Sequence, residues 1–134
     1  MAAMDAAEFA GTQVNRWLGF RLRARSAERV EIEQDVRPEM LQETGVVQGG
    51  LLTALADTAA VYLLWPDLGD ARTMTGTTVS MQFLSGARPG EGPLRAVATP
   101  LRVGRKLAVC ESCVHQGERL VCKGTFTFLL MEKA

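Results

Sequence analysis

This chain of 134 residues has a single histidine, a single tyrosine, three cysteines and no excess of charge of either sign. One histidine leaves too few imidazole groups for a histidine-based metal site, so we expect no metal ion. Three cysteines are an odd number, without the even framework of a small disulfide-bonded secreted domain. Fifteen basic and fifteen acidic residues balance, which gives no electrostatic reason to expect nucleic acid as a partner.

We also expect no segment that directs the protein to a membrane or to export. The N-terminal stretch MAAMDAAEF carries acids where a signal peptide has positive charge followed by an apolar run. The longest apolar run, residues 51–65, would span only about 22 Å as a helix and has Asp57 at its middle, which counts against a membrane span. We therefore expect no membrane partner and a cytoplasmic location, with Cys110, Cys113 and Cys122 reduced.

Length and composition predict one domain over residues 1–134, because 47% apolar residues supply a real but modest core. The chain is organised around QGGLLTALADTAAVYLLW, from Gln48 to Trp65. Leucine and alanine without interior glycine or proline favour a helix after the Gly-Gly pair. Apolar residues cover nearly every side of this helix, which predicts that it is buried on all sides.

A shorter helix is expected before it, because Asp5 and Glu8 resemble a capping box and Gly19 is placed to end a helix. Most of the remaining chain alternates apolar and polar residues, which predicts strands over residues 20–25, 30–36, 73–84, 94–103, 106–115 and 119–131. An apolar helix in an otherwise β chain must be wrapped by the sheet, so the predicted class is α+β, with a curved antiparallel sheet around one central helix. One helix shields one sheet face, and we expect exposed edges to pair between subunits.

Asp57 is the only carboxylate in the long helix, and burial of an unpaired charge is costly. An apolar environment raises the pKa of a carboxyl group, which makes it a better base near neutral pH. Gly49 and Gly50 leave backbone N–H groups at the helix start unobstructed by side chains. The helix start can bind an electrophile, and a carboxylate lies about two turns further along the helix. Together these two features predict an active site. The alternatives are an Asp57 bonded to the backbone or to Thr58, and glycines that serve only a turn.

The segment V-Q-G-G-L-L-T-A-L-A-D-T-A-A resembles the signature of hotdog-fold acyl-CoA thioesterases, in the branch of the phenylacetate-pathway thioesterase. That branch has H-G-G and then Leu-Ala-Asp, and Asp57 follows Gln48 by nine positions, as the family Asp follows its His. Weaker similarity covers nearly the whole chain, through T-T-V-S-M-Q-F-L-S-G-A and V-G-R-K-L-A. The resemblance implies a hotdog fold, a curved antiparallel β-sheet wrapped around one long central α-helix.

The resemblance also implies roles at the helix start. Asp57 would act as a general base on water or as a nucleophile on the thioester carbonyl. Gly49 would bind the thioester oxygen through its backbone N–H, beside Gly50. Gln48 stands where the family has His, and Gln42 where it has Asn. Both substitutes form hydrogen bonds, but Gln48 carries no proton to transfer, so we expect it to orient the thioester carbonyl as an amide donor.

Further substrate contacts are implied by position in the family. Thr77 or Thr78 would face the site from the partner subunit, and the alternative for each is an ordinary strand threonine. Arg102, Arg105 and Lys106 would hold the phosphates of coenzyme A, and the alternative is a solvated loop.

The sequence thus predicts a homo-oligomeric acyl-CoA thioesterase, dimeric or tetrameric, with its site at the subunit interface and no cofactor beyond the coenzyme A of its substrate. Its acyl group is expected to be aromatic or medium-chain. One alternative is a non-catalytic acyl-CoA-binding protein, which Gln48 favours, and another is an interaction module that uses the fold only for assembly. A hotdog-fold dehydratase acting on hydroxyacyl thioesters is disfavoured, because it would need a His with its carboxylate and His115 is far from the signature.

Overall fold

The apolar stretch forms one 16-residue helix, α3 (Gly49–Leu64). Gln48 caps its N-terminus, where its side-chain Oε1 accepts a hydrogen bond from the backbone N–H of Leu51 at 3.2 Å. Pro66 helps to end the helix, because proline has no N–H to donate to the carbonyl of Tyr62 one turn earlier. The helix therefore begins after its capping residue Gln48 and ends just before Pro66.

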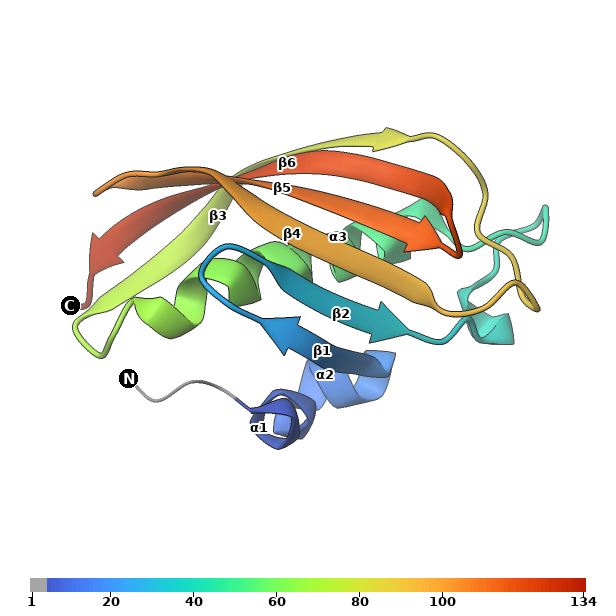
Figure 1. Ribbon diagram of the computed structural model, residues 1–134, viewed down its shortest axis with the longest axis horizontal. Coiled ribbons are helices and arrows are strands. Elements are labelled where there is room, and N and C mark those ends of the chain that lie inside the picture. The colour runs from blue at the N-terminus through green and yellow to red at the C-terminus, as the bar shows by residue number, and fades with distance from the viewer. Residues whose placement is uncertain (1–4) are drawn as a thin grey trace.

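A computed structural model describes residues 5–134, and in it α3 lies in the curve of a six-stranded antiparallel sheet (Figure 1). The strand order is β1-β2-β4-β5-β6-β3. The strands are β1 (Phe20–Arg25), β2 (Val30–Gln34), β3 (Arg72–Phe83), β4 (Leu94–Val103), β5 (Leu107–Gln116) and β6 (Arg119–Glu132). The short helices are α1 (Ala6–Gly11), α2 (Gln13–Leu18), η1 (Pro38–Met40) and η2 (Trp65–Asp67). This architecture confirms the predicted α+β hotdog fold.

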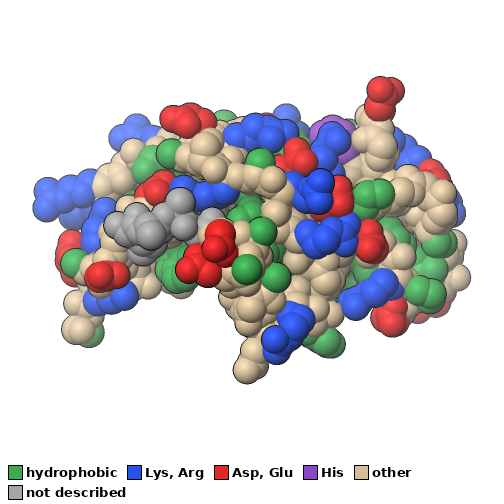
Figure 2. Space-filling view, turned by 60° about the horizontal axis from the view of Figure 1, so that its bottom comes forward, with side chains coloured by type: hydrophobic (Ala, Val, Ile, Leu, Met, Phe, Trp, Pro, Cys, Tyr) green, Lys and Arg blue, Asp and Glu red, His purple; other side chains and the backbone are tan. Residues whose placement is uncertain are grey.

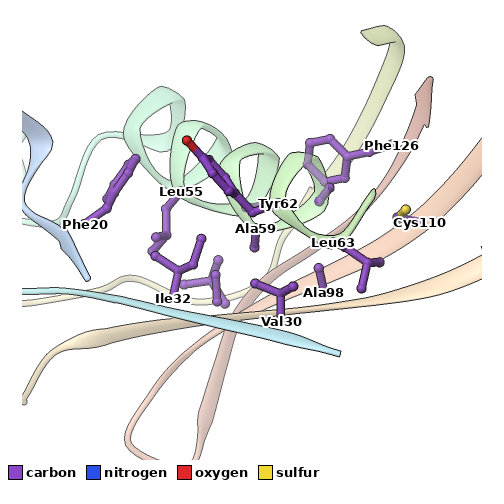
Figure 3. Close-up of a cluster of buried hydrophobic side chains, with 14 of the residues drawn as sticks. Phe20, Val30, Ile32, Leu55, Ala59, Tyr62, Leu63, Ala98, Cys110 and Phe126 are labelled. Carbon is purple, nitrogen blue, oxygen red and sulfur yellow. The ribbon is translucent and has the colours of Figure 1, made fainter. Parts of the chain in front are cut away.

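The core lies between α3 and the inner face of the sheet, where the two sets of side chains meet (Figure 3). In β5, alternation of buried and half-buried residues puts every second side chain on this inner face. The labelled core residues are Leu55, Ala59, Tyr62 and Leu63 of α3, and Phe20, Val30, Ile32, Ala98, Cys110 and Phe126 of the strands. The sheet thus supplies the apolar cover that the helix sequence requires.

The prediction that the helix is buried on all sides is wrong for the single chain. One line of residues along the helix is half-buried or exposed: Gly50, Ala54, Asp57, Val61 and Trp65. We call this line the open face of α3. A single sheet covers only one side of a helix, so the opposite side stays in contact with solvent. Apart from Asp57 the open face carries no charged or polar side chain, although nothing in residues 5–134 buries it fully.

The N-terminal segment forms two short helices instead of the single one expected. The capping box is confirmed, because the Asp5 carboxylate accepts from the backbone N–H of Glu8 at 2.8 Å and the Glu8 carboxylate accepts from that of Asp5 at 3.1 Å. The helix breaks at Thr12, which has extended backbone angles, and ends at Gly19 in the left-handed region at φ +74°. These two helices pack beside β1 and cover that edge of the sheet (Figure 1).

The two edges of the sheet differ in chemistry. β1 carries three arginines, and one of them, Arg21, pairs with Glu33 of β2 at 2.6 Å. β3 has no charged residue and no proline from Thr73 to Phe83, and most of its residues are exposed. Edge strands are normally protected by charge, proline or a covering helix. Only β1 has such protection among residues 5–134.

Charged side chains of both signs are interspersed over the surface seen in Figure 2. No helix within residues 5–134 combines the length and the apolar composition needed to cross a bilayer.

All three cysteines are free thiols. Cys110 and Cys122 are fully buried, and burial raises the pKa of each thiol to about 11. Cys113 is half-buried on the other face of the sheet from Cys110, as the period of two predicts.

Candidate functional site

The start of α3 offers three hydrogen-bond donors without acceptors. The backbone N–H groups of Gly49 and Gly50 make no hydrogen bond within residues 5–134, because they precede the first intrahelical bonds. The carbonyl oxygen of the Gln48 side chain is occupied by the N–H of Leu51, which leaves the Gln48 Nε2 amide free to donate. All three donors lie at the positive end of the helix dipole, where a carbonyl oxygen that gains negative charge is stabilised.

Two contacts from other elements fix this helix start. The N–H of Gln48 donates to the carbonyl of Met40 at 2.9 Å, and the N–H of Val47 donates to the carbonyl of Ala87 at 2.9 Å. The ring of Phe83 lies against Gly49, where an added Cβ would meet it at 3.2 Å. Sequence reasoning missed Phe83, although its place at the end of the strand in F-L-S-G-A was a signal.

Asp57 lies on the open face of α3, eight residues after Gly49, or about 12 Å further along the helix axis. Its carboxylate is half-buried, and this burial raises its pKa above the ordinary 3.8. Within residues 5–134 it makes no hydrogen bond or ion pair. The hydroxyl of Thr58 donates to the carbonyl of Ala54 at 2.7 Å instead. The alternative of a structural aspartate therefore lacks the bonds that would support it.

Gln42 lies on the turn that leads into the helix start. Its backbone N–H donates to the carbonyl of Val46 at 2.9 Å. Its side-chain Oε1 accepts from the backbone N–H of Thr44 and from the Thr44 hydroxyl, the latter at 2.8 Å. The Gln42 side-chain oxygen thus holds this turn, and its Nε2 makes no hydrogen bond among the described residues.

Thr77 and Thr78 are exposed on β3, the open edge of the sheet. Thr77 sits in a bulge, and its hydroxyl donates to the carbonyl of Thr127 at 3.3 Å. Thr78 is the cross-strand neighbour of Thr127, which lies on the outer face of the sheet. The chain does not bring Thr78 to its own Asp57.

Arg102, Arg105 and Lys106 lie at the turn between β4 and β5, at the far end of the molecule from Gly49 (Figure 1). Gly104 of this turn lines a cavity together with Leu64, the last residue of α3. The two ends of a 16-residue helix are about 24 Å apart. Within one chain these cations therefore do not reach the donors at the helix start.

Sequence reasoning missed a fourth cation at this end of the molecule. The Arg72 guanidinium, at the start of β3, donates to the carbonyl of Arg105. A cavity of about 400 Å³ is lined by Arg72, Arg105 and Lys106, with Glu132 beside them. No pattern in the sequence predicts a role for Arg72, because the start of β3 meets the β4–β5 turn only in the folded chain.

Comparison with known proteins confirms the expected resemblance. The sequence model of the thioesterase superfamily matches residues 44–123. An inferred esterase of Deinococcus radiodurans is 38% identical over 101 residues, which are 75% of this chain and 66% of that protein. The structure of an inferred thioesterase of Ralstonia eutropha, a phenylacetic acid degradation-related protein, is 28% identical with a TM-score of 0.83, covering 91% of this chain and 92% of that one. A thioesterase of Haemophilus influenzae shares the fold, with a TM-score of 0.88 over 98% of this chain and 93% of its own, at 22% identity.

Proposed function

Because the chain belongs to the thioesterase superfamily and is a thioester hydrolase, we propose that it cleaves an acyl-CoA thioester to a carboxylic acid and free coenzyme A. One observation carries the proposal. The carboxylate of Asp57 is half-buried without a partner among residues 5–134, on the same open face of α3 that begins at the free N–H groups of Gly49 and Gly50. Acyl transfer requires a base that is free to accept a proton and hydrogen-bond donors that are free to stabilise an oxyanion. Asp57 and the two N–H groups are free for these roles among residues 5–134.

In the proposed reaction the thioester oxygen accepts hydrogen bonds from the Gly49 N–H and the Gln48 Nε2. These donors stabilise the negative charge that this oxygen gains when the carbonyl is attacked. As a general base, Asp57 takes a proton from the attacking water. Because Asp57 of the same chain lies about 12 Å along the helix from Gly49, farther than one water bridges, this Asp57 would belong to a second copy of the chain. The bond from carbon to sulfur then breaks, and the same proton goes to the departing thiolate. As a nucleophile, Asp57 would instead form a mixed anhydride that water hydrolyses. Both routes need Asp57 ionised, and no metal or redox cofactor takes part in either.

We propose that the active protein is at least a dimer, paired through the open edge at β3. Antiparallel pairing of two copies of β3 sets the start of one strand beside the end of the other. The start of β3 carries Arg72 with Arg105 and Lys106 nearby, and its end carries Phe83 against Gly49. The cations of one copy would then lie at the end of the other copy where the thioester binds.

In this assembly the basic residues of one copy could bind substrate held by the other copy, which they cannot do within a single chain. Coenzyme A carries phosphates some distance from its thioester, and arginine and lysine are the usual protein ligands of phosphate. Arg102, Arg105 and Lys106 would hold those phosphates from the second copy. The same pairing would cover the open face of α3 and complete the burial that its apolar sequence calls for.

A cavity at the C-terminal end of α3 supports an apolar acyl group. It measures about 260 Å³ and lies where the open face of α3 meets the start of β3. Its lining is mainly apolar and aromatic: Val61, Tyr62, Trp65, Thr73, Met74, Gly76 and Phe128. Val61 is one helical turn beyond Asp57. We propose an aromatic or medium-chain acyl group as its occupant, and the cytoplasm as the place of reaction, since free cysteines suit a reducing compartment.

Three other functions were considered from the sequence, and the third is an interaction module that uses the fold only for assembly. A non-catalytic acyl-CoA-binding protein is favoured by Gln48, which cannot transfer a proton. A dehydratase is disfavoured by the position of His115, which alternates with the buried Val114 and Gln116 and so lies on the outer face of the sheet, away from α3.

The deciding experiment is hydrolysis of a panel of acyl-CoA thioesters, from acetyl to dodecanoyl and including benzoyl and phenylacetyl, with detection of the free thiol. Asp57→Asn is the test variant, and Asp70→Asn, at an exposed carboxylate beyond α3, is the matched control. The proposal requires turnover by the wild type and by the control, and its loss in Asp57→Asn. Binding of acyl-CoA without hydrolysis of any member of the panel would establish the binding-protein alternative.

A further inference from the structure

An irregular loop of residues 84–93 supports the segment that carries the three donors. The carbonyl of Ala87, in the middle of this loop, accepts the N–H of Val47. Gly86 is pressed against Val46, since an added Cβ would lie 2.8 Å from the Val46 side chain. We call residues 84–93 the support loop. Its position determines where Val47 lies, and Val47 precedes Gln48.

The support loop has no helix or strand of its own to fix it. It contains Gly90 and Gly92, both in the left-handed region at φ +80° and +93°. Glycine raises the conformational entropy that a loop loses on ordering. A loop of this kind stays in one place only when other residues bind its backbone. The start of the support loop is bound by the backbone of β6, where the carbonyl of Val121 accepts from the N–H groups of Leu84 and Ser85.

Gln116, the last residue of β5, binds the middle and the end of the support loop. It is 3% exposed, and its side-chain amide makes four hydrogen bonds. Its Oε1 accepts from the backbone N–H of Arg88 at 2.9 Å and from the Arg119 guanidinium at 3.0 Å. Its Nε2 donates to the carbonyls of Arg88 at 2.7 Å and Gly92 at 2.9 Å. The hydrogen-bonding capacity of the amide is thereby filled.

Arg119, the first residue of β6, binds the same loop from the other end of the hairpin turn. Its Nη2 donates to the carbonyl of Gly86 at 2.8 Å, and its Nη1 to the carboxylate of Glu91 at 2.8 Å. Together the two side chains bind the loop on both sides of Ala87. The hairpin itself does not need a buried amide, because Gly117 at φ +60° already makes its turn.

We propose that Gln116 and Arg119 are positioning residues for thioester hydrolysis. They hold the support loop so that the carbonyl of Ala87 fixes Val47, and through it the Gly49 N–H and the Gln48 amide. Donors for a developing oxyanion work because they are set in place before the reaction, and a misplacement of about 1 Å can cost about a hundredfold in rate. The catalytic part of this inference rests on the proposed function, whereas the part about the loop does not.

The test uses Gln116→Leu, which keeps most of the side-chain volume and removes all four hydrogen bonds. Arg119→Ala is the second variant. Its side chain is 40% exposed, so the fold survives its loss even if Gln116→Leu does not fold. Glu118→Ala, an exposed residue in the same turn, is the matched control. Val30→Ala, a fully buried residue at the far end of the sheet, controls for a general loss of stability.

Two quantities are measured on each folded variant: kcat and KM on the best thioester, and the hydrogen-exchange rate of the Val47 amide. For Gln116→Leu and Arg119→Ala we expect kcat to fall about tenfold with KM within about twofold, because the donors act mainly in the transition state. We expect the Val47 amide to exchange at least about tenfold faster while amides in the middle of β5 keep their protection. Both controls should leave both quantities unchanged.

Unchanged exchange at Val47 in the two variants would overturn the inference, whatever the activity. Faster exchange with unchanged kcat would overturn the catalytic role. A loss of kcat in Val30→Ala as large as in Gln116→Leu would also overturn it, because general destabilisation would then account for both. If the wild type hydrolyses no thioester, the proposed function fails, and the exchange measurement still decides whether the two residues hold the loop.

Discussion

At the scale of single residues, Asp57 combines half-burial, a raised pKa and the absence of a bond within residues 5–134. Asp57→Asn keeps the shape of the side chain and removes its basic and nucleophilic charge. We expect turnover to fall at least about a hundredfold, the usual size of a general-base contribution. Steady-state kinetics with the best thioester measures this. Turnover within a few-fold of the wild type would assign Asp57 a structural role.

The raised pKa of Asp57 also fixes the sign of two pH dependences. Hydrolysis needs the ionised carboxylate, so kcat/KM should rise with pH through a pKa above the ordinary 3.8. For stability, the folded state binds the proton more tightly than the unfolded state, so stability falls as pH rises through the raised pKa. Asp57→Asn escapes this loss. Its melting temperature should equal or exceed that of the wild type at neutral pH, and the difference should shrink as pH falls toward 3.8. A variant less stable than the wild type at neutral pH would contradict this sign.

Gln48 is the second residue whose role a substitution can test. Its Oε1 caps α3, and its Nε2 is free to donate. Gln48→Ala should slow hydrolysis by up to about a hundredfold, the cost of one oxyanion donor. Gln48→His should keep activity, because an imidazole N–H donates from a similar position. Equal rates in the wild type and both variants would place Gln48 outside the site.

At the scale of elements, the end of α3 depends on a residue far away in the sequence. Because Pro66 has no N–H, the carbonyl of Tyr62 lacks its intrahelical donor, and Arg25 of β1 replaces it at 3.0 Å. The same guanidinium donates to the carbonyl of Leu63 at 2.9 Å and pairs with Asp67 at 2.8 Å. β1 is thereby fastened to the central helix by a side chain that is only 10% exposed.

We expect Arg25→Met, which keeps the aliphatic part of the side chain, to lower the free energy of unfolding by about 2–4 kcal/mol, since two buried carbonyls lose a charged donor. Asp67→Asn is the control. It removes only an ion pair with a 54% exposed carboxylate, which is worth about 0–1 kcal/mol. Urea unfolding at one fixed protein concentration measures both. A loss for Arg25→Met no greater than for Asp67→Asn would mean that the carbonyl contacts do not matter.

The elements also show what the sequence determines and what it does not. The period of two in VCKGTFTFLLM and the capping box at Asp5 are local signals, and strands and caps follow from them directly. The bond from Arg25 to Tyr62 joins residues 37 positions apart, and no local pattern marks it. The same holds for Arg72, which reaches Arg105 only because β3 and the β4–β5 turn lie at one end of the sheet.

The open face of α3 shows a different limit. Val61 and Trp65 are as apolar as the buried Leu55 and Leu63, so hydrophobicity alone predicted burial on all sides. An apolar residue indicates that its side chain is buried in the functional protein, but it does not indicate whether its own chain or another chain buries it. For this reason the sequence predicted the site residues on α3 together, and could not indicate that the cations would lie at the opposite end of the chain.

At the scale of the whole molecule, β3 decides the expected assembly. Val79 lies opposite the buried Phe126, hence on the inner face of the sheet, yet it is 48% exposed because α3 does not reach it. If a second copy covers this position, Val79→Lys places a charge in the interface. We expect this variant to run as a monomer in size-exclusion chromatography with light scattering, and to lose most of its activity.

Ser80→Lys is the matched control, because the next residue along β3 faces the outer side of the sheet, opposite the exposed Thr125. A lysine there stays in water and should leave the oligomer intact. A wild type that is a stable monomer at micromolar concentration would remove both the dimer and the shared site. A Val79→Lys variant that stays dimeric would show that the subunits meet elsewhere.

The buried thiols have a consequence for the chemical reactivity of the protein. The thiolate form of a cysteine attacks a disulfide reagent, and at pH 8 a thiol with a pKa of about 11, as for Cys110 and Cys122, is only about 0.1% ionised. Cys113 is half-buried with its pKa also raised. The folded protein should therefore consume almost no chromogenic disulfide reagent, so that the colour formed during hydrolysis counts coenzyme A alone. The same reagent added in urea should titrate three thiols per chain, and so report unfolding.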